Sequence, residues 1–415
     1  MKKDKILLAG ATLSGNLGGH ALYMSFVKEY EKLFGKTEVT VLSKYFKDDK
    51  KEALKQGWKI VNYSTLYQLT YGMFFYCIGG TLKKFHMPYK WLAIGRLKAY
   101  KEADILVDLS GISFTDDRSI SGLIINTLWF LPAIILDKPM IKVSQSMGPF
   151  ETKIVRTVSK YMLEKMDIII ARGEISYHYV KNLLPNKRIY NLPDVAFCLR
   201  PRKLNMDKFG SKYGISLEFG YIAVGPSTVV EELMGEDKYI GLFKALVEKA
   251  YDLSKLPIIL VPHSRGHSKH IGVNSIRDDI STCKKIASCL SNKIPVFITE
   301  TNVKSDEIKG IISKAEIAVG SRYHFLIGAI SSGVPSLSVA WSHKYQEAFR
   351  EVGGNRMEKY VMKYQDVNCF KACSLLEELW ICRETLRQSM NHKLPEVIEN
   401  ARRNVKLAHS LITKV

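Results

Sequence analysis

An arginine, a histidine and a lysine follow two short apolar runs in the last third of the chain. Arg322 and His324 come just after residues 315–320, and Lys344 comes after residues 336–340. Arginine offers a planar fork that matches a carboxylate or a phosphate, lysine is a compact positive charge, and histidine can carry a proton near neutral pH. This combination predicts an anionic substrate that undergoes proton transfer.

The local pattern around these side chains predicts a strand, a helix and a second strand. Residues 325–331 are compatible with a helix, and the Gly-Val-Pro sequence at 333–335 would end it. Ligands of open α/β sheets bind at the carboxyl ends of the strands, beside the amino ends of helices. We therefore expect all three side chains at a ligand-binding edge. Taken singly, Arg322 would be a surface cation and His324 a structural histidine.

The length of 415 residues exceeds that of one ordinary core, and 46% of the residues are hydrophobic. Short apolar runs alternate with helix-compatible segments twice along the chain. The predicted fold class is α/β, with two Rossmann-like domains facing each other across a cleft and a C-terminal helical tail. The predicted divisions are residues 1–200, a connection at 201–218, a second domain at 219–370 and a tail at 371–415.

The loops that follow the predicted N-terminal strands carry further candidate residues. Asn16 lies in a glycine-rich loop after the strand at 5–9, but the spacing fits neither a dinucleotide fingerprint nor a P-loop. This loop would approach a phosphate or a sugar closely, or form a plain tight turn. Asp116 and Asp117 would accept hydrogen bonds from sugar hydroxyls, or act as turn formers.

Two more polar side chains directly follow apolar runs. Arg172 follows residues 168–171, and His263 lies two residues after the strand predicted at 258–261. Arg172 would be a further cation at the ligand edge, and His263 would contact the acceptor or serve a structural role. The chain has no H-E-x-x-H motif and no cysteine cluster, so we expect neither a metal nor a cofactor.

The formal net charge is +20, which attracts anions such as nucleic acid, acidic lipid headgroups or phosphorylated metabolites. The basic residues are scattered and accompany no RNA-binding or zinc-finger motif, so we expect no nucleic-acid partner. Residues 120–136 form the longest apolar stretch, but they include polar residues and Pro132 and are too short for a membrane span. A buried or interfacial helix is expected there. The odd number of cysteines, without a C-x-x-C pair, favours reduced thiols in the cytoplasm.

Several segments together resemble the polysaccharide pyruvyl transferase family. The most specific is 320–344, with the form G-x-R-x-H, then G-x-P and then a lysine. The other segments that carry the resemblance follow the family's order and are residues 16–18, 108–117, 145–150, 171–172, 193–196 and 261–263. The chain differs from the family at Gly19 and His20, where an acidic residue is usual.

The resemblance implies a GT-B-like pair of domains that transfers the pyruvyl unit of phosphoenolpyruvate to a sugar of a cell-surface polysaccharide precursor. The product would be a cyclic ketal, and phosphate would be released. The functional cations of the family correspond to Arg172, Arg322 and Lys344, and the histidine of its motif to His324. His324 is the expected general acid and base, because its unperturbed pKa of about 6.5 suits proton transfer near neutral pH.

Two other functions remain open at this point. A GT-B glycosyltransferase with a nucleotide-sugar donor would share the architecture, but it would need a carboxylate for the nucleotide ribose near Gly333. A non-catalytic protein that binds polyanions or membrane surfaces would explain the positive charge and the apolar stretch. If the sugar acceptor is linked to a lipid, the basic surplus would help a cytoplasmic enzyme dock on the inner face of the membrane.

Overall fold

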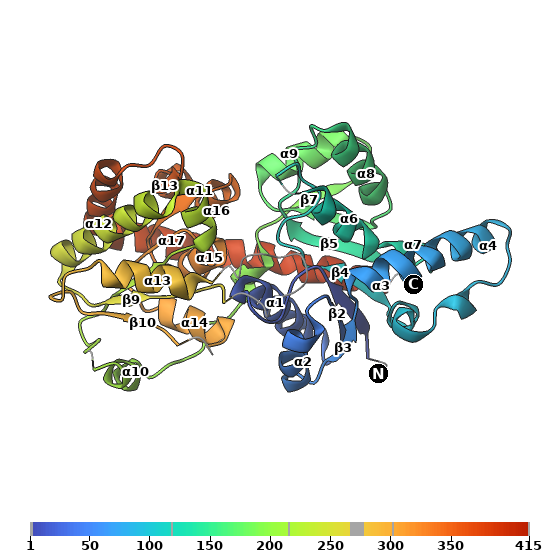
Figure 1. The fold of residues 1–415 in the computed structure, drawn as a ribbon, viewed down its shortest axis with the longest axis horizontal. Helices are drawn as coiled ribbons and strands as arrows, with labels where there is room; N and C mark the ends of the chain where they lie inside the picture. The colour runs from blue at the N-terminus through green and yellow to red at the C-terminus, as the bar shows by residue number, and fades with distance from the viewer. Residues whose placement is uncertain (1–2, 118, 215, 266–277, 301–302, 414–415) are drawn as a thin grey trace. The chain divides into compact units, whose positions relative to one another are not determined.

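The structure is a computed structural model that describes residues 3–117, 119–214, 216–265, 278–300 and 303–413 (Figure 1). The chain forms two compact units. The first contains Met1–Ser14, Leu22–Val195 and Asn400–Val415, and the second contains Gly15–Ala21 and Ala196–Glu399. The first pass of the chain through the first unit thus ends at Val195.

The first unit is built on a seven-stranded parallel sheet with the strand order β3-β2-β1-β4-β5-β6-β7. Its central strands are buried along their length, which explains why they appear in the sequence as uninterrupted apolar runs. The strands are β1 Lys5–Ala9, β2 Glu38–Ser43, β3 Lys59–Asn62, β4 Ile105–Asp108, β5 Met140–Gln145, β6 Ile168–Ala171 and β7 Ile189–Asn191.

Helices and short helical turns connect these strands. The α-helices are α1 Leu17–Phe34, α2 Phe46–Lys55, α3 Thr65–Tyr67, α4 Gly80–Lys84, α5 Lys98–Glu102, α6 Ile120–Leu128, α7 Leu131–Ile135, α8 Lys153–Glu164 and α9 Glu174–Leu183. Between β3 and α5 lie two π-helical turns, η1 Gln68–Gly72 and η2 Phe75–Gly79, and two 3₁₀ turns, η3 Lys90–Leu92 and η4 Gly95–Leu97. A further 3₁₀ turn, η5 Val195–Cys198, follows where the chain passes from the first unit into the second.

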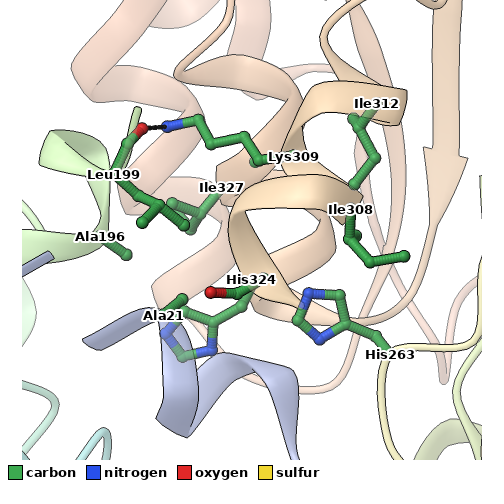
Figure 2. Close-up of a pocket in the computed structure, with 11 residues that line it drawn as sticks. Ala21, Ala196, Leu199, His263, Ile308, Lys309, Ile312, His324 and Ile327 are labelled. Atoms are coloured by element: carbon green, nitrogen blue, oxygen red, sulfur yellow. Dashed lines mark hydrogen bonds between the residues drawn. The ribbon is translucent and has the colours of Figure 1, made fainter. Parts of the chain in front are cut away.

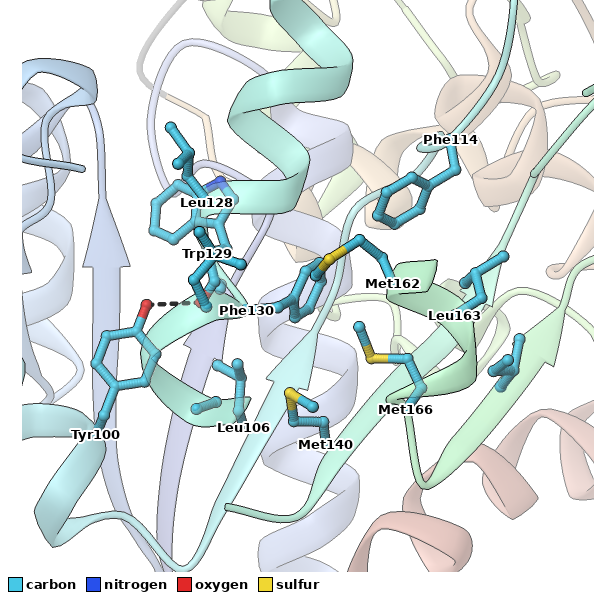
Figure 3. Close-up of a cluster of buried hydrophobic side chains, with 14 of the residues drawn as sticks. Tyr100, Leu106, Phe114, Leu128, Trp129, Phe130, Met140, Met162, Leu163 and Met166 are labelled. Atoms are coloured by element: carbon cyan, nitrogen blue, oxygen red, sulfur yellow. Dashed lines mark hydrogen bonds between the residues drawn. The ribbon is translucent and has the colours of Figure 1, made fainter. Parts of the chain in front are cut away.

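Aromatic and methionine side chains fill the core between the first sheet and its helices (Figure 3). The Tyr100 hydroxyl donates to the carbonyl oxygen of Trp129 at 2.8 Å, so that its polar end is satisfied inside the core. Lys142 is fully buried on β5, paired with Asp108 and placed over the rings of Phe114 and Phe130. Pairing and ring contact offset part of the cost of burying this charge.

The predicted helix at residues 120–136 is two helices, because the chain turns at Trp129 and Phe130 between α6 and α7. Most of the apolar side chains in this stretch belong to the core. The prediction of one continuous helix was therefore wrong, and the prediction of burial was right. In the described part of the chain, no helix has both the length and the apolar composition that crossing a membrane requires.

The second unit repeats the same topology with six parallel strands in the order β10-β9-β8-β11-β12-β13. Both orders place the first strand of each unit beside its fourth, which is the Rossmann arrangement. The strands are β8 Ile222–Gly225, β9 Ile258–Leu260, β10 Val296–Ile298, β11 Ile317–Gly320, β12 Ser336–Ala340 and β13 Val361–Lys363. The helices are α10 Met206–Lys212, α11 Thr228–Met234, α12 Glu236–Ser254, α13 Asp279–Ser288, α14 Ser305–Ile312, α15 Tyr323–Ile330 and α16 Lys344–Glu358.

The stretch predicted as a connection, 201–218, packs in the second unit. The backbone N–H of Arg202 donates to the carbonyl oxygen of Asp306 at 2.9 Å, and Tyr213 on the turn after α10 stacks on Phe297 with ring centroids 4.5 Å apart. The predicted helical tail is α17, Cys369–Ile412, a single helix that continues through Pro395. Its residues up to Glu399 belong to the second unit and those from Asn400 to the first.

Candidate functional site

Arg322 follows strand β11. The strand order of the second sheet reverses between β8 and β11, so Arg322 lies beside this switch point. Strands β8 and β11 pair in register at Gly225 and Gly320, and the ring of Phe325 covers both glycines. A Cβ atom on Gly320 would lie 2.7 Å from Cδ1 of Phe325, so this packing requires glycine. Such a switch point is where α/β sheets bind ligands.

The guanidinium of Arg322 is held in place by the buried carboxylate of Asp279. Nε donates to Oδ2 at 2.7 Å, and Nη2 donates to Oδ1. Asp279 is 0% exposed, and the side chain of Arg322 is 16% exposed. Burial alone would lower the pKa of Arg322, but the charge of Asp279 outweighs it and the net shift is upward. This arginine is therefore a fixed positive charge.

Asp279 also organises the loops around it, and the sequence analysis did not identify it. Its carboxylate accepts hydrogen bonds from the backbone N–H groups of Thr228, His263 and Ser264, at 3.0, 3.2 and 2.7 Å. One acidic residue thus joins the segments after β8, β9 and β11. The sequence feature that could have indicated a role for Asp279 is the pair Asp278-Asp279 at the start of α13, but acidic residues are also typical of an ordinary helix start.

His324, in the first turn of α15, packs against the first turn of α1. A Cβ atom on Gly18 would collide with the imidazole, at 2.8 Å from Cγ. The Gly18 N–H donates to the side-chain oxygen of Asn16 at 2.9 Å, and the Leu17 N–H donates to the carbonyl oxygen of His263 at 3.1 Å. The structure therefore brings Asn16, His263 and His324 together. Asn16 was predicted in the N-terminal domain, but it belongs to the second unit because of these bonds.

His263 lies on the segment after β9 and is 4% exposed. Burial lowers the pKa of His263 well below 6.5, and neighbouring positive charges, led by that of His324, lower it further. His263 is therefore a neutral imidazole near pH 7. It suits hydrogen bonding at that pH and does not suit donation of a proton from the charged form.

Lys344 begins α16 and is 6% exposed. Its ammonium group lies over three aromatic rings, at 4.2 Å from the centroid of Trp341, 5.0 Å from that of Tyr323 and 5.6 Å from that of Tyr345. Such a cage stabilises a cation that has left bulk water. The Tyr345 hydroxyl also donates to the carbonyl oxygen of Ser321 at 2.9 Å, which connects this cage to the loop that carries Arg322.

A small cavity adjoins the two histidines within the second unit (Figure 2). Lys309, on α14, lies at the end of the cavity opposite the imidazoles and donates to the carbonyl oxygen of Leu199 at 2.5 Å. His20 is buried nearby, with its Nδ1 2.7 Å from the Ser305 hydroxyl. The position where the family usually has an acid therefore holds an imidazole bonded to α14.

The buried amine of Lys309 predicts a pH-dependent stability. Burial lowers its pKa to about 7, whereas an unfolded lysine titrates near about 10.4. Between these values the unfolded chain binds a proton that the folded chain does not, so Lys309 destabilises the fold increasingly as pH falls from about 10 to about 7. We expect Lys309→Met to raise the free energy of unfolding by a few kcal/mol at about pH 7, roughly as the shift implies. The gain should shrink toward about pH 10.

Urea unfolding at both pH values measures this difference. Lys293→Met removes an exposed lysine and should show no such trend. A Lys309→Met variant whose stability relative to the native chain is the same at both pH values would contradict the assignment.

Arg172, Asp116 and Asp117 belong to the first unit. Arg172 is 4% exposed; it pairs with Asp194 and donates to the carbonyl oxygen of Gly111 at 2.8 Å and to the Ser146 hydroxyl at 3.0 Å. These contacts hold it at the carboxyl edge of the first sheet. Its predicted contact with an anionic substrate stays a prediction.

The carboxylate of Asp116 binds the start of the segment that leads into α8. It accepts from the backbone N–H of Glu151 at 2.8 Å and from the backbone N–H and hydroxyl of Thr152 at 3.2 and 2.6 Å. This is the turn-forming role left open above, while Asp117 is exposed. The acceptor-binding role of both aspartates stays a prediction. Within the described residues, no group of three or more His, Cys, Asp or Glu side chains is placed to hold a metal ion.

Solved structures similar to this chain have the two-domain fold called GT-B. A UDP-GlcNAc 2-epimerase from Neisseria meningitidis, bound to UDP-GlcNAc, matches with a TM-score of 0.60 and 12% identity over 99% of this chain and 100% of that one. A putative UDP-N-acetylglucosamine 2-epimerase from Listeria monocytogenes matches with a TM-score of 0.58 and 13% identity, over 97% and 94%. At this identity the likeness shows the fold alone and confirms the predicted fold class.

Sequence comparison adds the family. The amylovoran biosynthesis protein AmsJ of Erwinia amylovora is 20% identical over 281 residues, which cover 64% of this chain and 63% of AmsJ. The match thus spans less than two thirds of that relative. Residues 16–343 match the family described as polysaccharide pyruvyl transferase, and this range includes Arg322, His324 and Gly18, against which His324 packs. With most of its length matched, the chain belongs to the polysaccharide pyruvyl transferase family.

Proposed function

We propose that this protein transfers the pyruvyl unit of phosphoenolpyruvate to a sugar of a cell-surface polysaccharide precursor, with formation of a ketal and release of phosphate. The observation that carries the proposal is the anchored pair at the start of α15. Arg322 is fixed by a buried carboxylate, and His324, two residues later, packs directly against Gly18. An oriented cation next to an oriented imidazole suits an anion that must accept a proton.

Asp279 engages only one edge of the Arg322 guanidinium. Asp279 occupies the edge formed by Nε and Nη2, so Nη1 lies on the far side of the guanidinium. Lys344 supplies a second cation, held in its aromatic cage. Phosphoenolpyruvate carries a carboxylate and a phosphate, and these two groups are what two cations in a fixed arrangement would bind. We propose Arg172 as a further contact and no metal or cofactor in the reaction.

In the proposed reaction, His324 donates a proton to the methylene carbon of the phosphoenolpyruvate double bond. The adjacent carbon then has oxocarbenium character, and one sugar hydroxyl adds to it and loses its proton. Phosphate leaves with the electrons of its bond to that carbon, and a second hydroxyl of the same sugar adds in its place. Of the two hydroxyl protons, one replaces the proton given to the methylene carbon and the other leaves with phosphate.

The alternative is a glycosyltransferase with a nucleotide-sugar donor, which would need a carboxylate for the nucleotide ribose near Gly333. The test incubates the protein with phosphoenolpyruvate or with UDP-sugars and a panel of glycosides, and measures phosphate release and product mass. Phosphate release with a mass gain from phosphoenolpyruvate supports the proposal, whereas glycosyl transfer from UDP-sugars overturns it.

A Gly18→Ala substitution tests the contact that orients His324. The added methyl group must displace the imidazole or the loop, and displacement of a catalytic group by about 1 Å can cost on the order of 10² in rate. We expect a turnover loss of this order, measured as phosphate release from phosphoenolpyruvate. Gly241→Ala is the matched control, because a Cβ atom there meets open space. Equal turnover in both variants would exclude this orienting role.

A further inference from the structure

One segment of the first unit carries an unusual number of exposed apolar side chains. It runs from residue 64 to residue 97 between β3 and α5 and contains α3, η1, η2, α4, η3 and η4. We call this segment the arm. In Figure 1 the helical part of the arm, from α3 to α4, extends away from the sheet of its own unit.

The helical part of the arm has an inner face that packs on its own unit. Gln68, Gly72, Phe75 and Gly79 are buried at spacings of three and four residues, which place them on one side of a helix. A Cβ atom on Gly79 would lie 3.2 Å from a methyl carbon of Ile135. The inner face therefore rests directly on α7.

The outer face of the same helical stretch is apolar and exposed. Leu66, Leu69, Phe74 and Ile78 are 72%, 50%, 50% and 42% exposed. The returning part of the arm adds four more large side chains in the same state, namely Phe85 at 67%, Met87 at 52%, Trp91 at 64% and Ile94 at 61%. Single exposed apolar residues are ordinary, but a concentration of eight in one segment indicates an interaction surface.

The charge of the arm identifies what this surface would meet. The arm contains no Asp or Glu and has four basic residues, Lys83, Lys84, Lys90 and Arg96, of which Lys83 pairs with Asp137 just after α7. Lys84 and Lys90 are exposed beside Phe85 and Trp91. Apolar and aromatic side chains next to an excess of bases are typical of segments that lie in the interface of an anionic membrane.

We propose that the arm docks this protein on the surface of a membrane that contains anionic lipids. The apolar side chains would enter the headgroup region, and the bases would meet the lipid phosphates. The indole N–H of Trp91 already donates to the carbonyl oxygen of Pro88 at 3.0 Å. The ring can therefore move from water into the headgroup region with its polar N–H still hydrogen-bonded. The inference concerns the first unit and does not depend on the proposed pyruvyl transfer.

A second copy of the chain fits this surface less well. In a symmetric dimer the same surface faces itself, so the basic residues of one arm would lie against those of the other. Like charges placed together oppose association, whereas anionic headgroups neutralise them.

The test is flotation of the full chain with vesicles of phosphatidylcholine, with and without phosphatidylglycerol. We expect binding to the anionic vesicles and weak binding to the neutral ones. Phe85→Ser with Trp91→Ser should lower the partition coefficient by about a hundredfold, because two large apolar side chains would no longer be transferred from water into the membrane. Lys84→Gln with Lys90→Gln should lower it by about tenfold or more, since each base near the surface contributes.

Two control pairs of substitutions distinguish docking by the arm from nonspecific membrane binding by a protein with this net charge. Phe219→Ser with Phe370→Ser removes side chains that are 81% and 87% exposed in the second unit, and Lys208→Gln with Lys293→Gln removes exposed bases there. Both pairs should bind like the native chain. Because all the replaced side chains are exposed, circular dichroism should show unchanged folding.

Three results would overturn the proposal. The native chain could fail to float with anionic vesicles, or the control pairs could lose as much binding as the arm pairs. Mass measurement in solution could also show a dimer that the Phe85 and Trp91 substitutions dissociate, which would make the arm a protein interface. Phosphate release with a water-soluble acceptor should be unchanged in the arm variants, so this test and that of the proposed function fail separately.

Discussion

The His324→Ala variant is expected to form the ketal product about 10²–10⁴ times more slowly than the native enzyme, the usual cost of losing a general acid or base. The structure gives a reason to choose this histidine over His263. His324 shares the start of α15 with the anchored Arg322, whereas His263 is buried with its pKa held well below 6.5. Phosphate release from phosphoenolpyruvate with a saturating glycoside acceptor measures the effect.

The matched control is His392→Ala, which removes an exposed histidine from α17 and should keep native turnover. His263→Gln keeps a hydrogen-bonding side chain in place of a neutral imidazole and should cost less than His324→Ala. If His324→Ala retains native turnover, or if His263→Gln is the more damaging change, the general acid has been assigned to the wrong residue.

The Asp279→Asn variant is expected to lose both stability and affinity for phosphoenolpyruvate. Removing one member of a buried ion pair leaves an uncompensated charge and typically costs about 3–5 kcal/mol. Asp279 is completely buried and holds Arg322 together with three backbone N–H groups. Urea unfolding measures the first effect, and the KM for phosphoenolpyruvate measures the loss of orientation of Arg322.

Two comparisons isolate the contribution of the Asp279–Arg322 ion pair to stability and activity. Glu378→Gln breaks the exposed pair with Lys359 and should cost at most about 1 kcal/mol. Combining Asp279→Asn with Arg322→Met removes the stranded charge, so part of the lost stability should return while activity stays low. An Asp279→Asn protein with native stability and native KM would show that the carboxylate does not position the arginine.

Much of the fold was predictable because buried parallel strands appear as short apolar runs. Strands β1, β6 and β12 have the predicted bounds. Strands β3, β7 and β13 were not predicted. They lie at sheet edges and are short, so they bury fewer apolar side chains and give a weaker pattern.

The candidate site was predictable to the extent that its residues follow strands. Arg322, His324 and Lys344 lie on α15 and α16 or directly beside them, as the alternation of strand and helix indicated. The placement of Asn16 with the second unit was not predictable, because it depends on backbone hydrogen bonds between residues almost 250 positions apart. The arm was missed because its bases and apolar residues are sequence neighbours, and only folding separates the buried side from the exposed one.

By itself, the sequence determined the family, the two α/β halves and the residue types that could bind an anion and move a proton, because these depend on local spacing. Only the tertiary structure decided how those side chains are held. Asp279 fixes Arg322, His324 packs against Gly18, and three aromatic rings surround Lys344. Contacts of this kind form between segments distant in the chain, and their energy depends on burial and orientation, which no local pattern of residues encodes.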